Sequence, residues 1–231
     1  MNVKGVIFDC DGTLLDSMGI WQGLEIKIAQ DAGIALSDKE RIMLNANTPV
    51  QTARYFHDHY GIGNNSEEIL SYMDDVLTGF YRYEVQPRQG AVELVEELKR
   101  RKIHMTIVSS SPGQLLRLGL ERAGIYSCFE EIISSCDMGI SKRGPLAIRH
   151  AQAIMHTEAE ETWGFEDSLY AAQVLASQQF GAVGIYDTDE AGTIEELRSV
   201  CNVVLRELDE LDIDKFLKGE YRRSQADARC A

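Results

Sequence analysis

The sequence lacks features that would point to secretion or to a membrane. Its cysteines are odd in number and scattered, at Cys10, Cys128, Cys136, Cys201 and Cys230. They form no C-x-x-C pair and no zinc-type spacing, so we expect free thiols in a reducing compartment and no disulfide framework. No apolar run approaches the length of a membrane span, and the first residues lack the pattern of a secretory signal. Both absences favour a cytoplasmic protein.

Basic charge is also scarce. The chain of 231 residues has 23 Lys and Arg against 37 Asp and Glu, which gives a formal net charge of -14. Such a chain repels nucleic acid and anionic membranes unless its positive charge is concentrated locally. The densest basic run, residues 99–102, is typical of the solvated end of a helix. We therefore expect neither nucleic acid nor a membrane as a partner.

Short apolar runs alternate with helix-length amphipathic segments over most of the chain. The runs span residues 3–9, 104–110, 130–135, 162–167, 181–187 and, more weakly, 202–205. This alternation predicts crossover units around a buried, largely parallel sheet, which is an α/β fold. With 44% hydrophobic residues, the chain can bury such a core and carry a smaller insert.

Residues 17–84 break this alternation because they contain no strand candidate. Apolar periodicity and capping signals predict four helices there, of which three have marked starts. The marks are a capping-box spacing at Ser37, the pair Thr48 and Pro49, and Ser66 before the last helix.

These patterns divide the chain into three parts. Residues 1–16 and 85–218 are expected to form the α/β core domain, with residues 17–84 as a helical domain inserted after the first strand. The polar stretch 219–231 has no periodicity, so we expect it to be disordered.

Two aspartates follow the first apolar run directly, in the stretch GVIFDCDGTLLDS. If that run is the first strand, Asp9 lies at its carboxyl end, where open parallel sheets bind their ligands. Because side chains alternate along an extended chain, Asp9 and Asp11 point to one side and Cys10 points away. Two neighbouring carboxylates repel by on the order of a few kcal/mol unless a proton or a cation intervenes. A bound magnesium ion would remove the conflict.

Other predicted strands carry polar residues at their ends, namely Ser109, Glu166 and Asp167, and Lys142 follows the third predicted strand. Each motif has an ordinary alternative: D-x-D-G stretches are common in turns, a lone lysine is most often a surface residue, and acids favour helix N-termini. Ser111, before Pro112, is the better cap for the next helix, which leaves Ser109 available for another role. The complete set at strand ends favours a functional site.

In order along the chain, these motifs resemble those of the haloacid dehalogenase superfamily. The matching stretches are DCDGT, VSSS, SKRGP and GFEDS. The resemblance covers nearly the whole chain and implies a Rossmann-like parallel sheet core. The helical insert is similar to the type 1 cap of the subgroup that contains phosphoglycolate phosphatase and β-phosphoglucomutase.

The resemblance also implies a mechanism. Asp9 would attack phosphorus and become an aspartyl phosphate, while Asp11 would protonate the leaving oxygen and then activate water. Mg²⁺ would be held by Asp9, by the backbone carbonyl of Asp11 and by Asp167, with Glu166 assisting.

The phosphoryl oxygens would be held by three side chains, those of Ser109, Ser110 and Lys142. The sequence departs from the family pattern twice. Arg143 and Gly144 precede the proline that usually follows the lysine directly, and Ala171 replaces a usual glycine. We expect both changes to adjust the backbone without abolishing the site.

The acid at Asp11 favours phosphoryl chemistry, because dehalogenases of the family lack an acid at that position. Mutases of this type usually carry a histidine after the first motif and a basic residue in the cap loop, and residues 14–24 and 45–51 contain neither. We therefore expect hydrolysis of a small-molecule phosphate ester, with a β-phosphoglucomutase-like phosphotransferase as the alternative. A phosphate-sensing or partner-binding module with little turnover is the alternative of another class.

Substrate contacts are expected from uncharged side chains of the insert, with candidates at Trp21, Asn45, Asn47, Thr48 and Gln51. They favour a sugar or polyol phosphate over a dicarboxylate. Trp21 fits the packed interior of the insert better than a substrate contact. An amphipathic helix can bury its apolar stripe within one chain or between chains, so the pattern fits a monomer and an oligomer alike.

Overall fold

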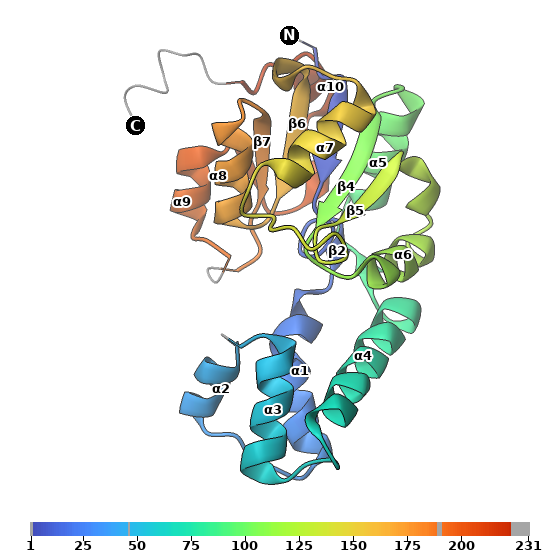
Figure 1. The fold of residues 1–231 in the computed structure, drawn as a ribbon. Coiled ribbons are helices and arrows are strands. Elements are labelled where there is room, and N and C mark those ends of the chain that lie inside the picture. Colours follow the sequence, from blue (N-terminus) through green and yellow to red (C-terminus); the bar gives the residue numbers. More distant parts are fainter. Residues whose placement is uncertain (1, 46, 189–190, 223–231) are drawn as a thin grey trace. The chain divides into compact units, whose positions relative to one another are not determined.

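The computed structural model describes residues 2–45, 47–188 and 191–222 of the chain. It divides into two compact units (Figure 1). We call the described residues up to Asp16 and from Gln86 onward the core unit, and Ser17–Val85 the helical insert.

Six parallel strands form the main sheet of the core unit, in the spatial order β5-β4-β1-β6-β7-β8. Their bounds are β1 Gly5–Phe8, β4 His104–Ser109, β5 Glu131–Ser134, β6 Thr162–Glu166, β7 Gly181–Ile185 and β8 Val203–Leu205. The predicted α/β fold with a parallel sheet is confirmed. The first strand lies between β4 and β6, so the strand order reverses beside β1, where open sheets bind ligands at the carboxyl ends of their strands.

Helices cover both faces of this sheet (Figure 1). They are α5 Ala91–Arg100, α6 Gly113–Arg122, α7 Leu146–Met155, α8 Leu169–Ser177, α9 Ile194–Val200 and α10 Ile213–Leu217, with short 3-10 helices at η1 Tyr126–Cys128, η2 Ala159–Glu161 and η3 Leu208–Glu210. On one face, apolar residues of α7 and α8 pack with Ile7. On the other, the rings of Trp163 and Phe165 pack against Phe216 of α10. Apolar side chains on both faces explain why the strands read as continuous apolar runs.

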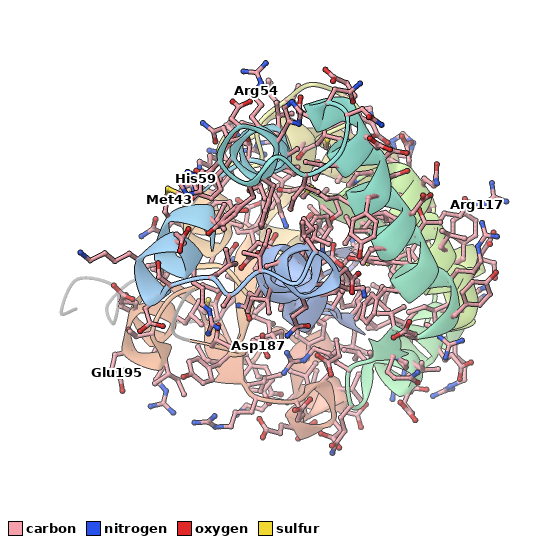
Figure 2. The ribbon with its side chains drawn as sticks, turned by 90° about the horizontal axis from the view of Figure 1, so that it is seen from below. Met43, Arg54, His59, Arg117, Asp187 and Glu195 are labelled. Carbon is pink, nitrogen blue, oxygen red and sulfur yellow. The ribbon has the colours of Figure 1, made fainter. Side chains whose placement is uncertain are left out.

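The surface of these helices is charged. Arg117 and Glu195 project outward from α6 and α9 (Figure 2). Arg117 Nε lies 2.8 Å from Glu121 Oε1, one helical turn away, as is typical of a solvated helix face. Within the described ranges, no helix combines the length and the apolar character that crossing a membrane requires.

The end of the described chain packs on the core unit. The guanidinium of Arg222 lies 5.3 Å from the centroid of the Trp163 ring and donates a hydrogen bond to the Ala159 carbonyl oxygen at 3.3 Å. Arg222 belongs to the stretch 219–231 that the sequence predicts to be disordered, and residues 223–231 of that stretch lie outside the described residues.

The helical insert contains the four helices that the sequence predicts, α1 Met18–Asp31, α2 Asp38–Asn45, α3 Pro49–Tyr60 and α4 Ser66–Tyr83. Their buried apolar residues include Leu24, Ile28, Phe56, Ile69, Met73, Leu77 and Tyr81. The apolar stripes thus pack against one another, which is what stabilises helices of this length.

Two of the predicted helix starts show how the sequence signals worked. At α2, the Ser37 N–H donates to Glu40 Oε2 at 2.8 Å and the Glu40 N–H donates to Ser37 Oγ at 3.4 Å, which confirms the capping box. At α4, the prediction was one residue off, because the cap is Asn65 and Ser66 is already helical. The Asn65 side chain accepts a hydrogen bond from the Glu68 N–H at 2.9 Å.

A two-stranded ribbon lies where the chain leaves and re-enters the core unit. Strand β2, Leu15–Asp16, pairs antiparallel with β3, Gln86–Pro87. Segments that are far apart in sequence are thereby fixed next to the turn that carries Asp11, on the core side of both connections.

Candidate active site

Three acids lie at the carboxyl ends of β1 and β6. Asp9 directly follows β1, and its N–H donates to the carbonyl oxygen of Phe165 at 2.9 Å, so the pairing with β6 continues past the last residue of the strand. Glu166 ends β6 and Asp167 follows it. All three side chains are buried, although acids are rarely buried without a partner.

The carboxylates of Asp9, Glu166 and Asp167 form a close cluster, in which one oxygen of each lies within 4.8 Å of the others. Burial, followed by the nearby Asp9 carboxylate, raises the pKa of Asp167 to about 8. Burial also raises the pKa of Glu166 well above its ordinary value. Both shifts show that this site disfavours a full set of negative charges unless a cation is present.

Lys142 supplies one cation from the segment between β5 and α7. Its Nζ lies 2.7 Å from Asp9 Oδ1 and 3.0 Å from Glu166 Oε1. Burial alone would lower the pKa of this ammonium group, but the Asp9 and Glu166 carboxylates outweigh burial and raise it. The lysine therefore stays charged at neutral pH.

The residues present fit a divalent cation. Carboxylate oxygens are the ligands that hard cations such as Mg²⁺ take in proteins. Fully ionised Asp9, Asp11, Glu166 and Asp167 outnumber the single positive charge of Lys142, so a divalent ion would offset most of the remaining excess. Asp9 and Asp167 could hold such an ion with Glu166 beside them. The predicted contribution of Asp11 comes from its backbone carbonyl and stays a prediction.

Asp11 is carried by a tight turn. The carbonyl oxygen of Cys10 accepts hydrogen bonds from the N–H groups of Leu14 at 2.8 Å and Leu15 at 2.9 Å. Gly12 has a φ of 74°, a left-handed conformation that glycine adopts without a steric penalty. The turn keeps Asp11 beside Asp9 at the edge of the sheet.

Ser111 is a site residue that the sequence assigned wrongly. Its Oγ donates a hydrogen bond to Asp11 Oδ2 at 2.6 Å, which orients the carboxylate. The prediction that Ser111 caps the following helix is wrong, because α6 begins at Gly113, whose N–H donates to Asp137 Oδ2 at 2.9 Å. The Asp137 side chain, from a distant segment, accepts the hydrogen bond that a capping residue would otherwise accept. The Ser111 hydroxyl instead binds Asp11.

The two serines predicted to hold a phosphoryl group lie in different surroundings. Ser109 ends β4, is buried, and accepts a hydrogen bond on Oγ from the Ser111 N–H at 3.2 Å. Ser110 is exposed and lines a cavity of about 460 Å³ together with Lys142. The structure therefore places Ser110 and Lys142 around one cavity, whereas Ser109 is hydrogen-bonded to the backbone of Ser111.

Arg88 is a further residue that sequence reasoning missed. It follows β3, and its N–H donates to the Leu14 carbonyl oxygen at 2.9 Å. Its Nη1 donates to the Gly12 carbonyl oxygen at 3.2 Å and to Asp187 Oδ1 at 2.9 Å; Asp187 is labelled in Figure 2. Arg88 thus binds the turn that carries Asp11 through the Gly12 carbonyl oxygen. No local pattern in the sequence predicts this contact.

The predicted substrate residues belong to the helical insert, where the side chains of three of them have hydrogen-bond partners within the insert. Trp21 Nε1 donates to the Tyr81 hydroxyl at 2.8 Å, so its polar group is used inside the insert. Thr48 forms a capping box with Gln51 at the start of α3. Asn47 lies in the bend before α3. The side chain of Asn45 is outside the described residues.

The chain matches the family described as haloacid dehalogenase-like hydrolase over residues 6–183. Among curated proteins, it is similar to pyrophosphatase PpaX of Oceanobacillus iheyensis, with 24% identity over 169 residues that cover 70% of this chain and 73% of the relative. It is also similar to validoxylamine A 7'-phosphate phosphatase of Streptomyces hygroscopicus subsp. limoneus, with 23% identity over 216 residues that cover 90% of this chain and 95% of the relative.

Solved structures share the fold over nearly the whole chain. The β-phosphoglucomutase of Clostridium difficile has a TM-score of 0.68 and 17% identity, with coverage of 95% of this chain and 97% of that one. YfnB of Bacillus subtilis, whose structure is bound to magnesium, has a TM-score of 0.68 and 19% identity, with coverage of 91% and 97%.

Proposed function

This chain belongs to the haloacid dehalogenase-like hydrolases, as an enzyme of the phosphatase kind, and we propose that it hydrolyses a small phosphomonoester with the help of Mg²⁺. The resemblance seen in the four sequence motifs is thereby confirmed at the level of the family. The finer proposal is that the substrate is a sugar or polyol phosphate and that the reaction passes through an aspartyl phosphate on Asp9.

The observation that most supports this proposal is the contact between Lys142 and Asp9 within the acidic cluster. A buried ion pair of 2.7 Å beside two further buried acids is costly for a merely structural end of a sheet. Perturbed titratable groups gathered at the carboxyl ends of strands are typical of catalytic sites.

In the first step, a carboxylate oxygen of Asp9 attacks the phosphorus atom. An oxygen–phosphorus bond forms to Asp9 while the bond from phosphorus to the alcohol oxygen breaks. Lys142 and Ser110, which line one cavity, would stabilise the charge on the phosphoryl oxygens. Asp9 and Asp167 would hold a divalent ion, which would supply the positive charge that lets an anionic nucleophile approach an anionic phosphate.

Asp11 moves the protons in both steps. Its carboxyl group gives a proton to the departing alcohol oxygen, and the resulting carboxylate then takes a proton from a water molecule that attacks the aspartyl phosphate. The bond between phosphorus and Asp9 breaks, which releases inorganic phosphate and restores both acids. The hydrogen bond from Ser111 Oγ, at 2.6 Å, holds Asp11 in place for both transfers.

Phosphate release from a panel of sugar, polyol and aryl phosphates tests the proposal. We expect turnover with Mg²⁺ that a chelator abolishes, and a loss in kcat of at least about 1,000-fold in Asp9→Asn. Asp58→Asn, at an exposed position of α3, is the matched control and should keep full activity.

Two outcomes would change the proposal. Full turnover by Asp9→Asn would exclude an aspartyl phosphate at that residue. Transfer of the phosphoryl group to a second hydroxyl of the same sugar, without release of inorganic phosphate, would favour the mutase alternative.

A further inference from the structure

The cavity beside Lys142 contains a second cation that the proposed chemistry does not use. The cavity measures about 460 Å³, which is within the usual range for small-molecule sites. Most of its lining comes from the segment between β5 and α7 (Figure 1), with Tyr170 contributed by α8. Ser110, Ser135 and Ser141 also line it. Arg143 is the second cation.

The guanidinium of Arg143 lies over the Tyr170 ring, with Cζ 4.3 Å from the ring centroid. Its backbone N–H donates to Ser141 Oγ at 3.2 Å. Among the residues that the structure describes, the Arg143 side chain forms no hydrogen bond and no ion pair. Stacking on an aromatic face fixes the plane of a guanidinium and leaves its N–H edges available to bind an anion.

Other arginines of the core unit pair with carboxylates instead. Arg88 pairs with Asp187 and Arg117 pairs with Glu121, each at 2.9 Å or less. Lys142, next to Arg143 in sequence, is already paired with two carboxylates. The Arg143 charge is therefore available to an anion from outside the protein.

We infer that Arg143, held in place by Tyr170, binds a second anionic group of the substrate. The substrate is then a phosphomonoester that also carries a carboxylate or a second phosphate group. The inference rests on the proposed function and adds to it, because the uncharged candidates in the insert predicted only hydroxyl groups on the substrate. The serines of the cavity suit the hydroxyl groups of such a sugar or polyol.

The test uses pairs of compounds that differ in one group. Phosphoglycerate is compared with glycerol phosphate for the carboxylate, and fructose bisphosphate with fructose monophosphate for the second phosphate. The variant Arg143→Met keeps an unbranched side chain at this position and removes its charge. Arg117→Met is the matched control, because Arg117 also lies over a tyrosine, 5.5 Å from the centroid of the Tyr126 ring, on the surface of α6 and outside the cavity.

We expect Arg143→Met to raise KM for the member with the second anionic group, in at least one pair, by about 10- to 100-fold, the effect of losing a charge-assisted hydrogen bond. KM for the member without that group should stay within about twofold. Tyr170→Phe should keep the selectivity, since the ring is retained, whereas Tyr170→Leu should lose part of it. Arg117→Met should behave as the wild type.

Calorimetric binding on an Asp9→Asn background gives a second readout that needs no turnover. The same selectivity should appear there, and Arg143→Met should remove it. An equal loss for both members of each pair would overturn the inference, because Arg143 would then bind the transferred phosphoryl group. Equal binding of both members by the Arg143-containing protein would overturn it as well.

The two proposals fail in distinguishable ways. If no compound releases phosphate with Mg²⁺ but selective binding through Arg143 persists, the proposed hydrolysis is wrong and the inference about Arg143 stands. If esters with and without the second anionic group are hydrolysed and bound alike, the hydrolysis stands and the inference is wrong.

Discussion

The core unit and the helical insert use their polar side chains in opposite ways. In the core unit, Asp9, Glu166 and Asp167 are buried next to one another, and Lys142 offsets only part of their charge. In the insert, polar side chains satisfy nearby backbone groups, as when the Thr48 N–H donates to Gln51 Oε1 at 2.8 Å. The core unit keeps like charges together against their repulsion, whereas the capping side chains of the insert bind backbone groups near them in sequence.

This difference separates polar side chains that stabilise the fold from polar side chains that indicate a ligand or a reaction. A capping side chain is explained by the helix that it starts, and it needs no ligand. A buried cluster of like charges is not explained by the fold, since apolar residues would fill the same space at less cost. The chemistry is therefore assigned to the core unit, and the polar residues of the insert are weaker guides to the substrate.

Removing Lys142 should have the largest effect. In Lys142→Met, Asp9 and Glu166 lose their cation, so the free energy of unfolding should fall by about 3–5 kcal/mol when a chelator is present. The value of kcat/KM with Mg²⁺ should fall by at least about 1,000-fold. Lys39→Met, at an exposed position of α2, is the control and should change neither quantity. Urea denaturation measures the free energy of unfolding, and phosphate release measures kcat/KM. Near-normal stability of Lys142→Met would contradict the repulsion that we assign to the acidic cluster.

Alanine substitution of two glycines with similar backbone conformations compares the core unit with the helical insert. Gly12 in the turn of Asp11 has a φ of 74°, and Gly61 at the end of α3 has a φ of 67°. Substitution by alanine should lower the free energy of unfolding by roughly 1–2 kcal/mol at either position. Only Gly12→Ala should also lower kcat, because only that turn carries a residue of the proposed mechanism, Asp11. Equal kcat values for the two variants would show that the turn tolerates displacement of Asp11.

Substitution of Thr48 tests whether this polar residue of the insert caps a helix or contacts the substrate. Thr48→Ala should lower the free energy of unfolding by about 1 kcal/mol, as expected for a lost helix cap, and Thr48→Ser should restore most of it. Neither variant should change KM, since the hydroxyl and the Gln51 side chain are used in the capping box. A KM that rises in Thr48→Ala and returns in Thr48→Ser would instead assign Thr48 to the substrate.

Removal of the Glu40 carboxylate should have the smallest effect on stability, and this effect should depend on pH. Hydrogen bonds from Ser37 and Tyr60 lower the pKa of Glu40 to about 2, below the value of about 4.3 for an unperturbed glutamate. The ionised form therefore stabilises the insert above about pH 4.3, and this contribution is lost as the pH falls toward 2. Melting curves should show Glu40→Gln below the wild type at neutral pH, with the gap closing in acid. A gap that stays constant between neutral and acid pH would contradict the assigned pKa.

The sequence predicted the architecture well because the patterns that mark each strand and the acids at its end are local in the sequence. Strands buried on two faces read as apolar runs, and each run corresponds to a strand of the sheet. Because Asp9 and Asp167 each follow a run, the rule that ligands bind at the carboxyl ends of strands placed them together before any contact was known. The cluster of Asp9, Glu166 and Asp167 has the composition that this rule predicts.

The supporting contacts could not be predicted in the same way. Ser111 is 100 residues away from Asp11, and Arg88 is 76 residues away from Gly12. A serine before a proline carries a strong local signal for a helix cap, and that signal misled the prediction because Asp137 fills the role through a tertiary contact. Arg143 differs again, since the departure from the family motif was visible in the sequence but the stacking on Tyr170 was not.

Crystals grown with Mn²⁺ and beryllium fluoride test most directly whether the acidic cluster holds a divalent ion beside a phosphoryl-accepting aspartate. Anomalous scattering would locate the ion, and the fluoride would mark the group bound to the carboxylate. We predict an ion that contacts Asp9 and Asp167, with beryllium bound to a carboxylate oxygen of Asp9. An ion bound elsewhere, with Asp9 still paired only to Lys142 and no beryllium on its carboxylate, would contradict the assignment.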